Sequence, residues 1–560
     1  MNAVIGERRR RTSKKGAGDE DSMEIIRTGT RLAAQSSARL LTLLAGFVWL
    51  ILTLAPDGVQ ATPAADPPAQ CKALASADFS QVLDATAQVK EAQMVSATKD
   101  DPAYCRIQGY VTPNVGIEVR LPTAGWNGKF LKVGCGGLCG TIIPEHCEFA
   151  VRRGYACIVS DMGHTSTGND GKWAYNNLEG KVDFAYRATH VAALAGKAIT
   201  ERYYRKAPER SYFIGCSQGG RQALVEAQRF PWDFDGIIAG APVISHTLSS
   251  LHLLWATALT QPEVGAKLPA QVVKQVHETV LNRCDLDDGV ADGLIGNPRA
   301  CRFDPSELAC SSRKKHGCLT DAHADIIKKL YSGATSTAGE KLYWGAARGS
   351  ELTWLDSLVS TSEGPTAIHN FAVELFKYLV FVPDPGPLWQ SANFDIDKDY
   401  RRFGMMESLY NASNPDLRRF KAAGGKLLIF QGWNDALVPP DSVIDYYETV
   451  QRTMGGRETT QDFSRLFMLP GADHCAGGVG ATAIDYLTSM ENWVEHGQAP
   501  DRLIGAHLKN QGAYAVHRSF PLNPDDVAFT RPVYPYPAVA RYTGTGDPKQ
   551  ADHFAPFIAK

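Results

Sequence analysis

Short apolar-rich runs alternate with stretches of helical periodicity along much of this chain. Runs at 116–121, 129–133 and 155–160 are predicted to be strands, because short apolar-rich runs between turn residues are typical of buried strands. Residues 183–204 carry apolar side chains at the spacing of an amphipathic helix. The pattern continues with a strand at 212–215, a helix at 219–229 and strands at 236–240, 426–430 and 465–469. Strands that alternate with helices predict an α/β fold with a largely parallel sheet covered on both faces.

The alternation stops between about residues 243 and 405. This stretch has helical patterns, four cysteines, an acidic loop and a proline-rich segment at 383–387. Because it separates two predicted strands of one sheet, residues 243–405 are predicted to form a lid domain inserted into the catalytic domain. The predicted catalytic domain then comprises residues 62–242 and 406–560.

The first 61 residues are predicted to be a signal peptide with a long basic amino-terminal region. An uncharged apolar run of 16 residues at 40–55 follows several arginines and lysines, and the small-residue sequence Val59-Gln60-Ala61 comes after it. A membrane-spanning helix needs about 20 apolar residues, so an uncleaved anchor is the less favoured alternative. Met23 is an alternative start that would shorten the basic region. We expect a secreted or periplasmic protein without stable membrane insertion after signal cleavage.

Composition narrows the possible classes of function. The chain has 560 residues, of which 44% are hydrophobic and 21% are charged, as is typical of globular proteins. A net charge of −2 leaves no basic excess to neutralise phosphates, so no nucleic-acid partner is expected. The 12 cysteines favour an exported protein with a hydrophobic core and several disulfides.

Residues 215–219, Gly-Cys-Ser-Gln-Gly, match the G-x-S-x-G motif of a nucleophile elbow. The motif lies between a predicted strand and a predicted helix, where its glycines would avoid collisions with neighbouring backbone. Such a hydrolase needs an acid and then a histidine further along the chain. Asp435 and His474 each follow a predicted strand in that order, so Ser217, His474 and Asp435 are the predicted catalytic triad. Asp473 is the alternative acid, although it adjoins His474 in sequence.

Cysteines adjoin two members of this predicted triad. Cys216 precedes Ser217, and Cys475 follows His474. If the serine and the histidine are within hydrogen-bond reach, their neighbours are close enough for a disulfide, which requires Cα atoms about 4.4–6.8 Å apart. A Cys216–Cys475 bridge is therefore expected, and two independent free thiols are the alternative.

This arrangement resembles the tannase and feruloyl esterase family of α/β-hydrolases, whose hallmark is Cys-Ser, Asp and His-Cys with a disulfide beside the triad. The resemblance extends from about residue 71 to 550 and includes the loops at 432–440 and 541–547. Hydrolases of terephthalate monoesters are similar too. The resemblance implies an α/β-hydrolase fold with a large inserted lid.

The glycine-rich segment 134–140 follows an early predicted strand. In α/β-hydrolases one oxyanion N–H group comes from such a loop, and the other comes from the residue after the nucleophile. The predicted oxyanion donors are therefore Gly136, with Gly137 as the nearest alternative, and Gln218. A glycine turn without a catalytic role is the other interpretation of the segment.

Four carboxylates crowd into residues 285–292 of the predicted lid. Oxygen ligands along a glycine-containing loop suit Ca²⁺, although no glutamate closes this loop as in an EF-hand. The family resemblance implies a structural calcium site whose ligands are the side chains of Asp285, Asp288 and Asp292 and the backbone carbonyls of Val290 and Leu294. Asp287 would then point away, and a solvated acidic turn is the alternative.

The resemblance also implies three further disulfides, Cys71–Cys105, Cys284–Cys301 and Cys310–Cys318. Cys135, Cys139, Cys147 and Cys157 remain, and the sequence leaves their pairing open. Relatives often carry another cysteine near the carboxyl terminus where this chain has Tyr534, so that bridge is not expected.

Together these residues predict an exported serine esterase that hydrolyses esters of aromatic carboxylic acids, such as hydroxycinnamoyl or galloyl esters, through an acyl-enzyme on Ser217. The expected substrates are small aromatic esters or esters derived from plant polyphenols and cell walls. Aromatic lid residues could stack on the ring of a substrate, although a place in the lid core is favoured for most of them. They are Trp354, Phe376, Phe381 and Trp389. A terephthalate-monoester hydrolase or broad carboxylesterase is the alternative activity. Peptidase or lipase activity stays open, and retention of all three triad residues argues against a non-catalytic binding module.

Overall fold

A nine-stranded sheet with the strand order β1-β2-β3-β5-β4-β6-β7-β8-β9 forms the centre of the described structure. The structure is a computed structural model that describes residues 66–260, 267–311, 317–510 and 517–558. The strands are β1 (Ala87–Val95), β2 (Tyr104–Val111), β3 (Val115–Pro122), β4 (Lys129–Val133), β5 (Ala156–Ser160), β6 (Arg210–Cys216), β7 (Gly236–Gly240), β8 (Lys426–Gly432) and β9 (Ser464–Leu469). The first three strands pair antiparallel, and those from β5 to β9 in the sheet order pair parallel. The predicted signal peptide, residues 1–61, lies outside the described residues.

Alternate residues of the parallel strands point into two separate hydrophobic clusters, one on each face of the sheet. In β6, Phe213 belongs to one cluster, whereas Tyr212 and Ile214 belong to the other. Successive side chains of a strand point to opposite faces, so a strand that is buried on both faces needs apolar residues throughout. This requirement explains the continuous apolar runs that identified these strands in the sequence.

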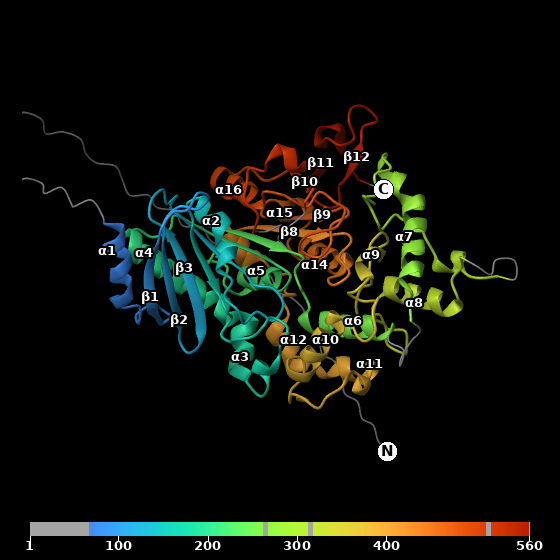
Figure 1. The fold of residues 1–560 in the computed structure, drawn as a ribbon, viewed down its shortest axis with the longest axis horizontal. Coiled ribbons are helices and arrows are strands. Elements are labelled where there is room, and N and C mark those ends of the chain that lie inside the picture. Colours follow the sequence, from blue (N-terminus) through green and yellow to red (C-terminus); the bar gives the residue numbers. More distant parts are fainter. Residues whose placement is uncertain (1–65, 261–266, 312–316, 511–516, 559–560) are drawn as a thin grey trace, which may run out of the picture. The chain divides into compact units, whose positions relative to one another are not determined.

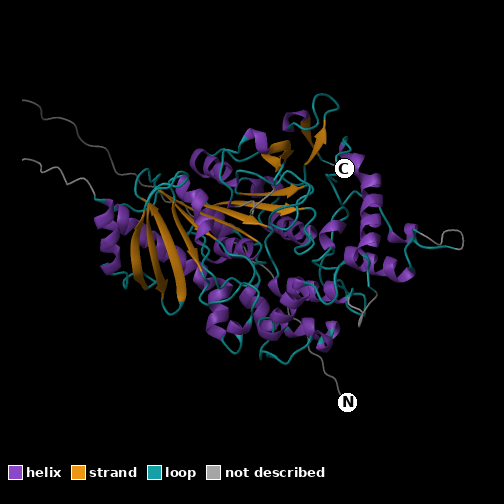
Figure 2. Ribbon diagram, in the orientation of Figure 1, coloured by secondary structure: helices purple, strands orange, loops and turns teal. Residues whose placement is uncertain are grey.

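Helices cover both faces, as Figures 1 and 2 show. On one face, α4 (Ala188–Tyr204) and α5 (Gln218–Arg229) contact each other and the sheet. On the other face, α2 (Glu148–Arg152) and α16 (Tyr486–His496) contact β5, β7 and β8. The helix predicted at 183–204 begins with a π-helical turn, Asp183–Arg187, and continues as α4. These layers are the α/β-hydrolase architecture that the sequence predicted.

The segment between β7 and β8 adds helices and contributes no described strand to the main sheet. It contains α6 (His246–Ala258), α7 (Ala270–Cys284), α8 (Asp321–Ser332), α9 (Glu351–Trp354), α10 (Ala367–Tyr378), α11 (Ile396–Asp399), α12 (Gly404–Tyr410) and α13 (Arg418–Ala422). Side chains of α7, α8 and α9 form a third hydrophobic cluster, whereas those of α10 and α12 join a cluster of the sheet. Helices α10 and α12 both contact α6, and Figure 1 shows the three side by side. The lid boundaries at 243 and 405 stay predictions.

The remaining elements frame the sheet. They are α1 (Pro67–Ala73), α3 (Leu178–Val182), α14 (Pro440–Thr453), α15 (Arg457–Gln461) and two small antiparallel pairs, β10 (Leu503–Leu508) with β11 (Val527–Val533) and β12 (Val539–Tyr542) with β13 (Phe554–Phe557). Tyr534, where relatives often carry a cysteine, is buried and donates a hydrogen bond to the carbonyl of Phe554 over 3.1 Å. None of the described helices is long and apolar enough to cross a membrane.

All twelve cysteines are paired at disulfide distance. The pairs include Cys71–Cys105, Cys284–Cys301 and Cys310–Cys318, as the family resemblance implied. The four cysteines left open by the sequence form Cys135–Cys139 and Cys147–Cys157. These two short bridges tie the segments that follow β4 and that enter β5.

Candidate active site

Ser217 lies on a sharp turn between the carboxyl end of β6 and the first residue of α5. Its backbone has φ 63° and ψ −119°, a conformation that L-residues rarely adopt and that stores strain. The flanking glycines are required by close backbone approach: a Cβ on Gly215 would lie 2.7 Å from the Gly219 backbone. A Cβ on Gly220 would lie 2.2 Å from the carbonyl oxygen of Gly240. The structure therefore has the nucleophile elbow that the motif predicted.

His474 and Asp435 complete a continuous hydrogen-bonded chain with this serine. The Nε2 atom of His474 is 2.8 Å from Ser217 Oγ, and its Nδ1 atom is 2.7 Å from Asp435 Oδ2. The other carboxylate oxygen of Asp435 accepts hydrogen bonds from the backbone N–H groups of Leu437 and Val438, both over 2.9 Å. The structure thus brings the three predicted residues together in the geometry of a Ser-His-Asp triad.

Asp473, the alternative acid, lies elsewhere. Its Oδ1 is buried without a hydrogen-bond partner among the described residues, and it approaches the backbone of Gly478 rather than the imidazole. Burial, together with the charge of Asp435, raises the pKa of Asp473 to about 7. The geometry therefore favours Asp435 as the carboxylate that orients His474.

The environment of His474 favours its protonated form. Burial alone would lower the pKa of this imidazole, but the charge of Asp435 and the hydrogen bond that it accepts raise the pKa above its ordinary value of 6.5. Asp435 is fully buried, so its charge acts on the ring with little screening by water. An imidazole held in this way can accept a proton from Ser217 and retain it briefly.

A cavity opens beside the triad, and its lining includes Gly136, Gly137, Ser217 and Gln218. A Cβ on Gly136 would meet nothing within 4 Å, which shows that this residue borders open space. Gln218 is the first residue of α5, where backbone N–H groups have no partner within the helix. The predicted oxyanion donors are therefore adjacent to the serine, and their roles remain a proposal.

Neighbouring side chains support this glycine-rich loop. The Cys135–Cys139 bridge spans it, and the side-chain amide of Gln222 from α5 contacts Cys135. The Nε2 atom of His164 is 2.8 Å from the carbonyl oxygen of Leu138. Its ring stacks on Trp173 with centroids 3.7 Å apart. This second imidazole therefore positions the loop and does not reach the triad.

A bridge joins the turn that carries Ser217 to the loop that carries His474. Cys216 and Cys475 are paired with Cα atoms 5.8 Å apart, across 259 positions of sequence. Both cysteines also line the cavity. The predicted disulfide beside the triad is therefore present in the structure.

A cavity of about 450 Å³ opens above Ser217, within the size range of small-molecule sites. Its apolar wall comes mainly from α6, α10 and the loop after β8, and includes Leu253, Ile368, Phe371, Leu375, Leu437 and Val438. Uncharged polar groups also face it, Ser249 and His246 from α6 and Thr167 and Asn169 from the segment after β5. The cavity can hold an apolar ring with a few hydrogen-bonding substituents.

The aromatic lid residues that the sequence offered as ring contacts do not line this cavity. Trp354, Phe376 and Phe381 are buried in lid or main-sheet clusters, and Trp389 stacks on Phe376. The lid-core interpretation is therefore the correct one for this set. Among the described phenylalanine, tyrosine and tryptophan side chains, it is Phe371 that lines the cavity, on α10 between Ile368 and Leu375. The apolar spacing 368, 371, 375 marks one face of a helix, but it does not reveal whether that face meets core or cavity.

The acidic loop of the lid lies against the carboxyl-terminal strands. The Asp285 carboxylate accepts backbone hydrogen bonds from Gly293 and Leu294, and Asp292 pairs with Arg531. Burial raises the pKa of Asp288 to about 7, with further contributions from the charges of Asp292 and Asp285. Asp287 is exposed. The loop thus offers carboxylate oxygens of the kind that Ca²⁺ binds, although those of Asp285, Asp288 and Asp292 do not all lie within 4.8 Å of one another. Calcium binding here stays a prediction.

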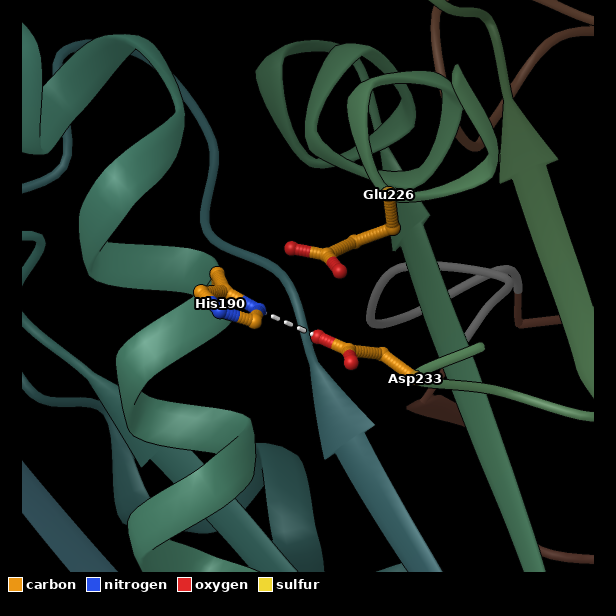
Figure 3. A group of neighbouring side chains, drawn as sticks. All are labelled: His190, Glu226 and Asp233. Atoms are coloured by element: carbon orange, nitrogen blue, oxygen red, sulfur yellow. Dashed lines mark hydrogen bonds and ion pairs between the residues drawn. The ribbon is translucent and has the colours of Figure 1, made fainter. Parts of the chain in front are cut away.

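A second titratable group lies between α4, α5 and the turn before β7, as Figure 3 shows. His190 Nδ1 is 2.5 Å from Asp233 Oδ2, and the Glu226 side chain points toward this pair. Both Glu226 oxygens are buried without a donor among the described residues, and so is Asp233 Oδ1. Burial, then the charge of Asp233, raises the pKa of Glu226 well above its usual range.

These residue types can bind a divalent metal, but burial and the charge of Asp233 favour a proton on Glu226, even though the two nearby lysines partly lower its pKa. The positive charges of Lys132 and Lys197 already act on Glu226. A divalent ion would therefore add a large positive excess to a buried site, which is costly. A proton on Glu226 instead lets its hydroxyl donate to Asp233 while Asp233 accepts from His190.

The fold and the site together define the class of this protein. A parallel sheet with a nucleophile elbow after β6, a histidine after β9 and a carboxylate after β8 defines an α/β-hydrolase. Residues 96–556 match the family described as tannase and feruloyl esterase. The chain belongs to this family and is a carboxylic ester hydrolase.

Individual relatives agree with this assignment. A probable feruloyl esterase of Arthroderma benhamiae is 34% identical, with 79% of this chain and 83% of that protein aligned. The mono(2-hydroxyethyl) terephthalate hydrolase of Piscinibacter sakaiensis is 31% identical over 81% of this chain and 85% of that protein. The crystal structure of feruloyl esterase B from Aspergillus oryzae superposes with a TM-score of 0.77 and 29% identity, covering 88% of this chain and all (100%) of that one.

Removal of the bridge beside the triad is expected to lower turnover more than stability explains. The bridge closes a loop of 259 residues, for which chain entropy gives about 5 kcal/mol of stabilisation. It also fixes His474 against Ser217, and misplacement by about 1 Å can cost roughly 100-fold in rate. We expect Cys216→Ala with Cys475→Ala to fold at low temperature with kcat reduced by about that factor, measured alongside thermal melting.

The matched control is Cys71→Ala with Cys105→Ala, which removes a buried bridge between α1 and β2 that does not line the cavity. This control should lose stability and keep kcat. Equal kcat losses in the two double variants would contradict a positioning role for the Cys216–Cys475 bridge.

Glu226 is expected to make stability fall as pH rises above about 4.5. Its folded pKa is raised above the usual 4.5, so the folded state binds more protons than the unfolded state above that pH. Its contribution to stability is therefore complete below about pH 4.5 and is lost as pH rises through the raised pKa. Glu226→Gln, which mimics the neutral acid, should make Tm depend less on pH when it is measured between pH 5 and 9. Glu226→Asp keeps a titrating group and should retain the dependence. If the wild-type protein bound one equivalent of a metal ion and Glu226→Gln lost it, the assignment of a proton to Glu226 would be wrong.

Proposed function

We propose that this protein is an exported serine esterase that hydrolyses esters of aromatic carboxylic acids through an acyl-enzyme on Ser217. The observation that carries the proposal is the hydrogen-bonded chain from Ser217 through His474 to Asp435, which opens into a largely apolar cavity. Family membership supports ester hydrolysis, and the triad residues supply the chemistry.

Acylation begins at the short contact between Ser217 and His474. The serine hydroxyl attacks the ester carbonyl carbon while His474 Nε2 takes its proton. Asp435 holds the Nδ1–H tautomer and stabilises the imidazolium that forms. The tetrahedral intermediate then collapses as His474 returns the proton to the alcohol oxygen. The alcohol leaves, and the acid stays as an ester on Ser217.

The backbone N–H groups of Gly136 and Gln218 donate to the oxyanion of the tetrahedral intermediate. The amino-terminal end of α5 adds partial positive charge at the same point. In the second half of the reaction, His474 takes a proton from water, the hydroxide oxygen attacks the acyl carbon, and Ser217 leaves with the proton that His474 returns. Each step uses groups of this chain and needs no redox partner.

The cavity supports an aromatic acyl group. Phe371 and the aliphatic side chains of α6 and α10 offer contacts for a ring, and Thr167, Asn169 and Ser249 offer hydrogen bonds for hydroxyl substituents. Two of the relatives are named as feruloyl esterases, which favours hydroxycinnamoyl esters. Galloyl esters and a broader carboxylesterase range belong to the same proposal. A third relative is named for a terephthalate monoester, which makes that class the alternative.

Export and a calcium ion complete the proposal. Six disulfides suit an oxidising compartment, which supports the signal peptide inferred at residues 1–61. The carboxylates of Asp285, Asp288 and Asp292, with the carbonyls of Val290 and Leu294, would hold Ca²⁺. The ion would neutralise negative charge of these carboxylates, of which Asp292 is already paired with Arg531. Its role there is structural, because the loop does not line the cavity above Ser217.

The triad assignment predicts unequal effects for two neighbouring aspartates. Ser217→Ala should abolish hydrolysis of methyl ferulate and methyl gallate, and it should prevent labelling by a serine-directed phosphonate. Asp435→Asn should lower kcat/KM by roughly 1,000- to 10,000-fold, because the imidazole can then adopt the wrong tautomer.

Asp473→Asn is the matched control, because this carboxylate is buried nearby but does not contact His474. It should retain most of the activity. A larger loss in Asp473→Asn than in Asp435→Asn would refute the acid assignment, and a folded wild-type enzyme inactive on every aromatic ester would refute the proposed function.

The calcium proposal predicts a ligand-dependent melting temperature. Exhaustive chelation should lower Tm by several degrees, because an ion that binds only the folded state stabilises it by mass action. Asp288→Asn should show a smaller response to chelation, whereas Asp287→Asn, which alters the exposed neighbour, should respond like the wild type. Elemental analysis without calcium, combined with an unchanged Tm after chelation, would exclude the site.

A further inference from the structure

Among the described residues, the wall of the cavity above Ser217 carries no formal charge outside the triad histidine. No described residue that lines it is a lysine, an arginine, an aspartate or a glutamate, and its titratable side chains are histidines. A substrate therefore meets apolar groups and neutral hydrogen-bonding groups along this surface.

The histidines away from the triad do not supply a positive charge near neutral pH. Burial, then the charge of Arg221, lowers the pKa of His246 to about 3. Burial, then the charge of His146, lowers the pKa of His517 to about 3, and burial lowers the pKa of His146 as well. These rings act as neutral donors and acceptors.

Arg221 acts on His246 of this wall, and its guanidinium donates to backbone carbonyls. Nη1 donates to the carbonyls of Ala185 and Tyr410 over 2.7 and 3.0 Å, and Nη2 donates to the carbonyl of Phe184 over 2.7 Å. The side chain is fully buried and does not line the cavity. Its charge is committed to backbone carbonyls and cannot form an ion pair with a bound acid.

We propose that this esterase selects uncharged aromatic acyl groups and discriminates against acyl groups with a second, ionised carboxylate, such as terephthalate monoesters. This inference rests on the proposed function. Transfer of a carboxylate into a cavity that offers no cation costs several kcal/mol, whereas a phenol or a methoxyl group can use the neutral polar groups that are present. Although a relative is named for a terephthalate monoester, the charge pattern of this cavity favours hydroxycinnamoyl and hydroxybenzoyl esters.

The test compares two esters that differ only in charge. Methyl 4-carbamoylbenzoate and the anion of monomethyl terephthalate have nearly the same shape, and methyl ferulate serves as the reference substrate. We expect kcat/KM for the carbamoyl ester to exceed that for the anionic ester by about 100-fold or more, with most of the difference in KM.

A charge introduced into the wall should reverse the preference. Phe371 is partly exposed on α10, so an arginine there can reach the cavity without becoming a fully buried charge. Phe371→Arg is expected to raise kcat/KM for the anionic ester relative to the carbamoyl ester by at least about tenfold. Phe371→Met, which keeps a neutral side chain of similar length, should leave the wild-type ratio unchanged.

The outcomes separate the inference from the proposed function. If methyl ferulate is hydrolysed but the anionic and carbamoyl esters have equal kcat/KM values, the neutral-cavity inference is wrong and the proposed function stands. If Phe371→Met changes the ratio as much as Phe371→Arg, ring loss rather than charge controls selectivity, which also contradicts the inference. Activity on none of the three esters would overturn the proposed function and the inference together.

Discussion

The active site depends on the 2.8 Å hydrogen bond between His474 Nε2 and Ser217 Oγ, because this contact joins segments that the sheet keeps apart. Ser217 follows β6 and His474 follows β9, with β7 and β8 between them. Three strand spacings amount to about 14 Å, so the loop after β9 must return across two strand ends to reach the serine. Backbone contacts such as Asn434 N–H to the carbonyl of Ala472, at 2.9 Å, hold that loop over β8.

The other components need less help from loops, because the topology already places them together. Gly136 follows β4, which is the direct neighbour of β6, and Asp435 follows β8, which is the direct neighbour of β9. All four strands are parallel, so their carboxyl ends meet at one edge of the sheet, where ligand sites of open α/β sheets form. The insertion after β7 then covers this edge with α6 and α10, which supply much of the apolar wall.

The sequence predicted the parts of the fold whose burial is complete. Strands β4 and β7 have the bounds that their apolar runs indicated, since both faces of each are covered. Strand β1 escaped prediction, because its residues are mostly exposed or half-buried and carry no consistent apolar alternation. The triad residues could be named because their motif and order are fixed by the fold. Phe371 could not be distinguished from the core aromatics of the lid, because helical periodicity does not tell a cavity wall from a packed interface.

Three residues around the site share a backbone feature. Ser217, Cys475 and Cys139 are three non-glycine residues with φ values of 63°, 64° and 59°, a region that costs non-glycine residues of order 1–3 kcal/mol when it is strained. Two of them are cysteines in bridges, and the third adjoins a bridged cysteine. Such conformations persist only where the surroundings over-determine them, and cross-links do so without adding polar groups to the cavity. The Cys135–Cys139 and Cys216–Cys475 bridges therefore cross-link the segments that hold these residues without placing a charged group in the described wall of the cavity.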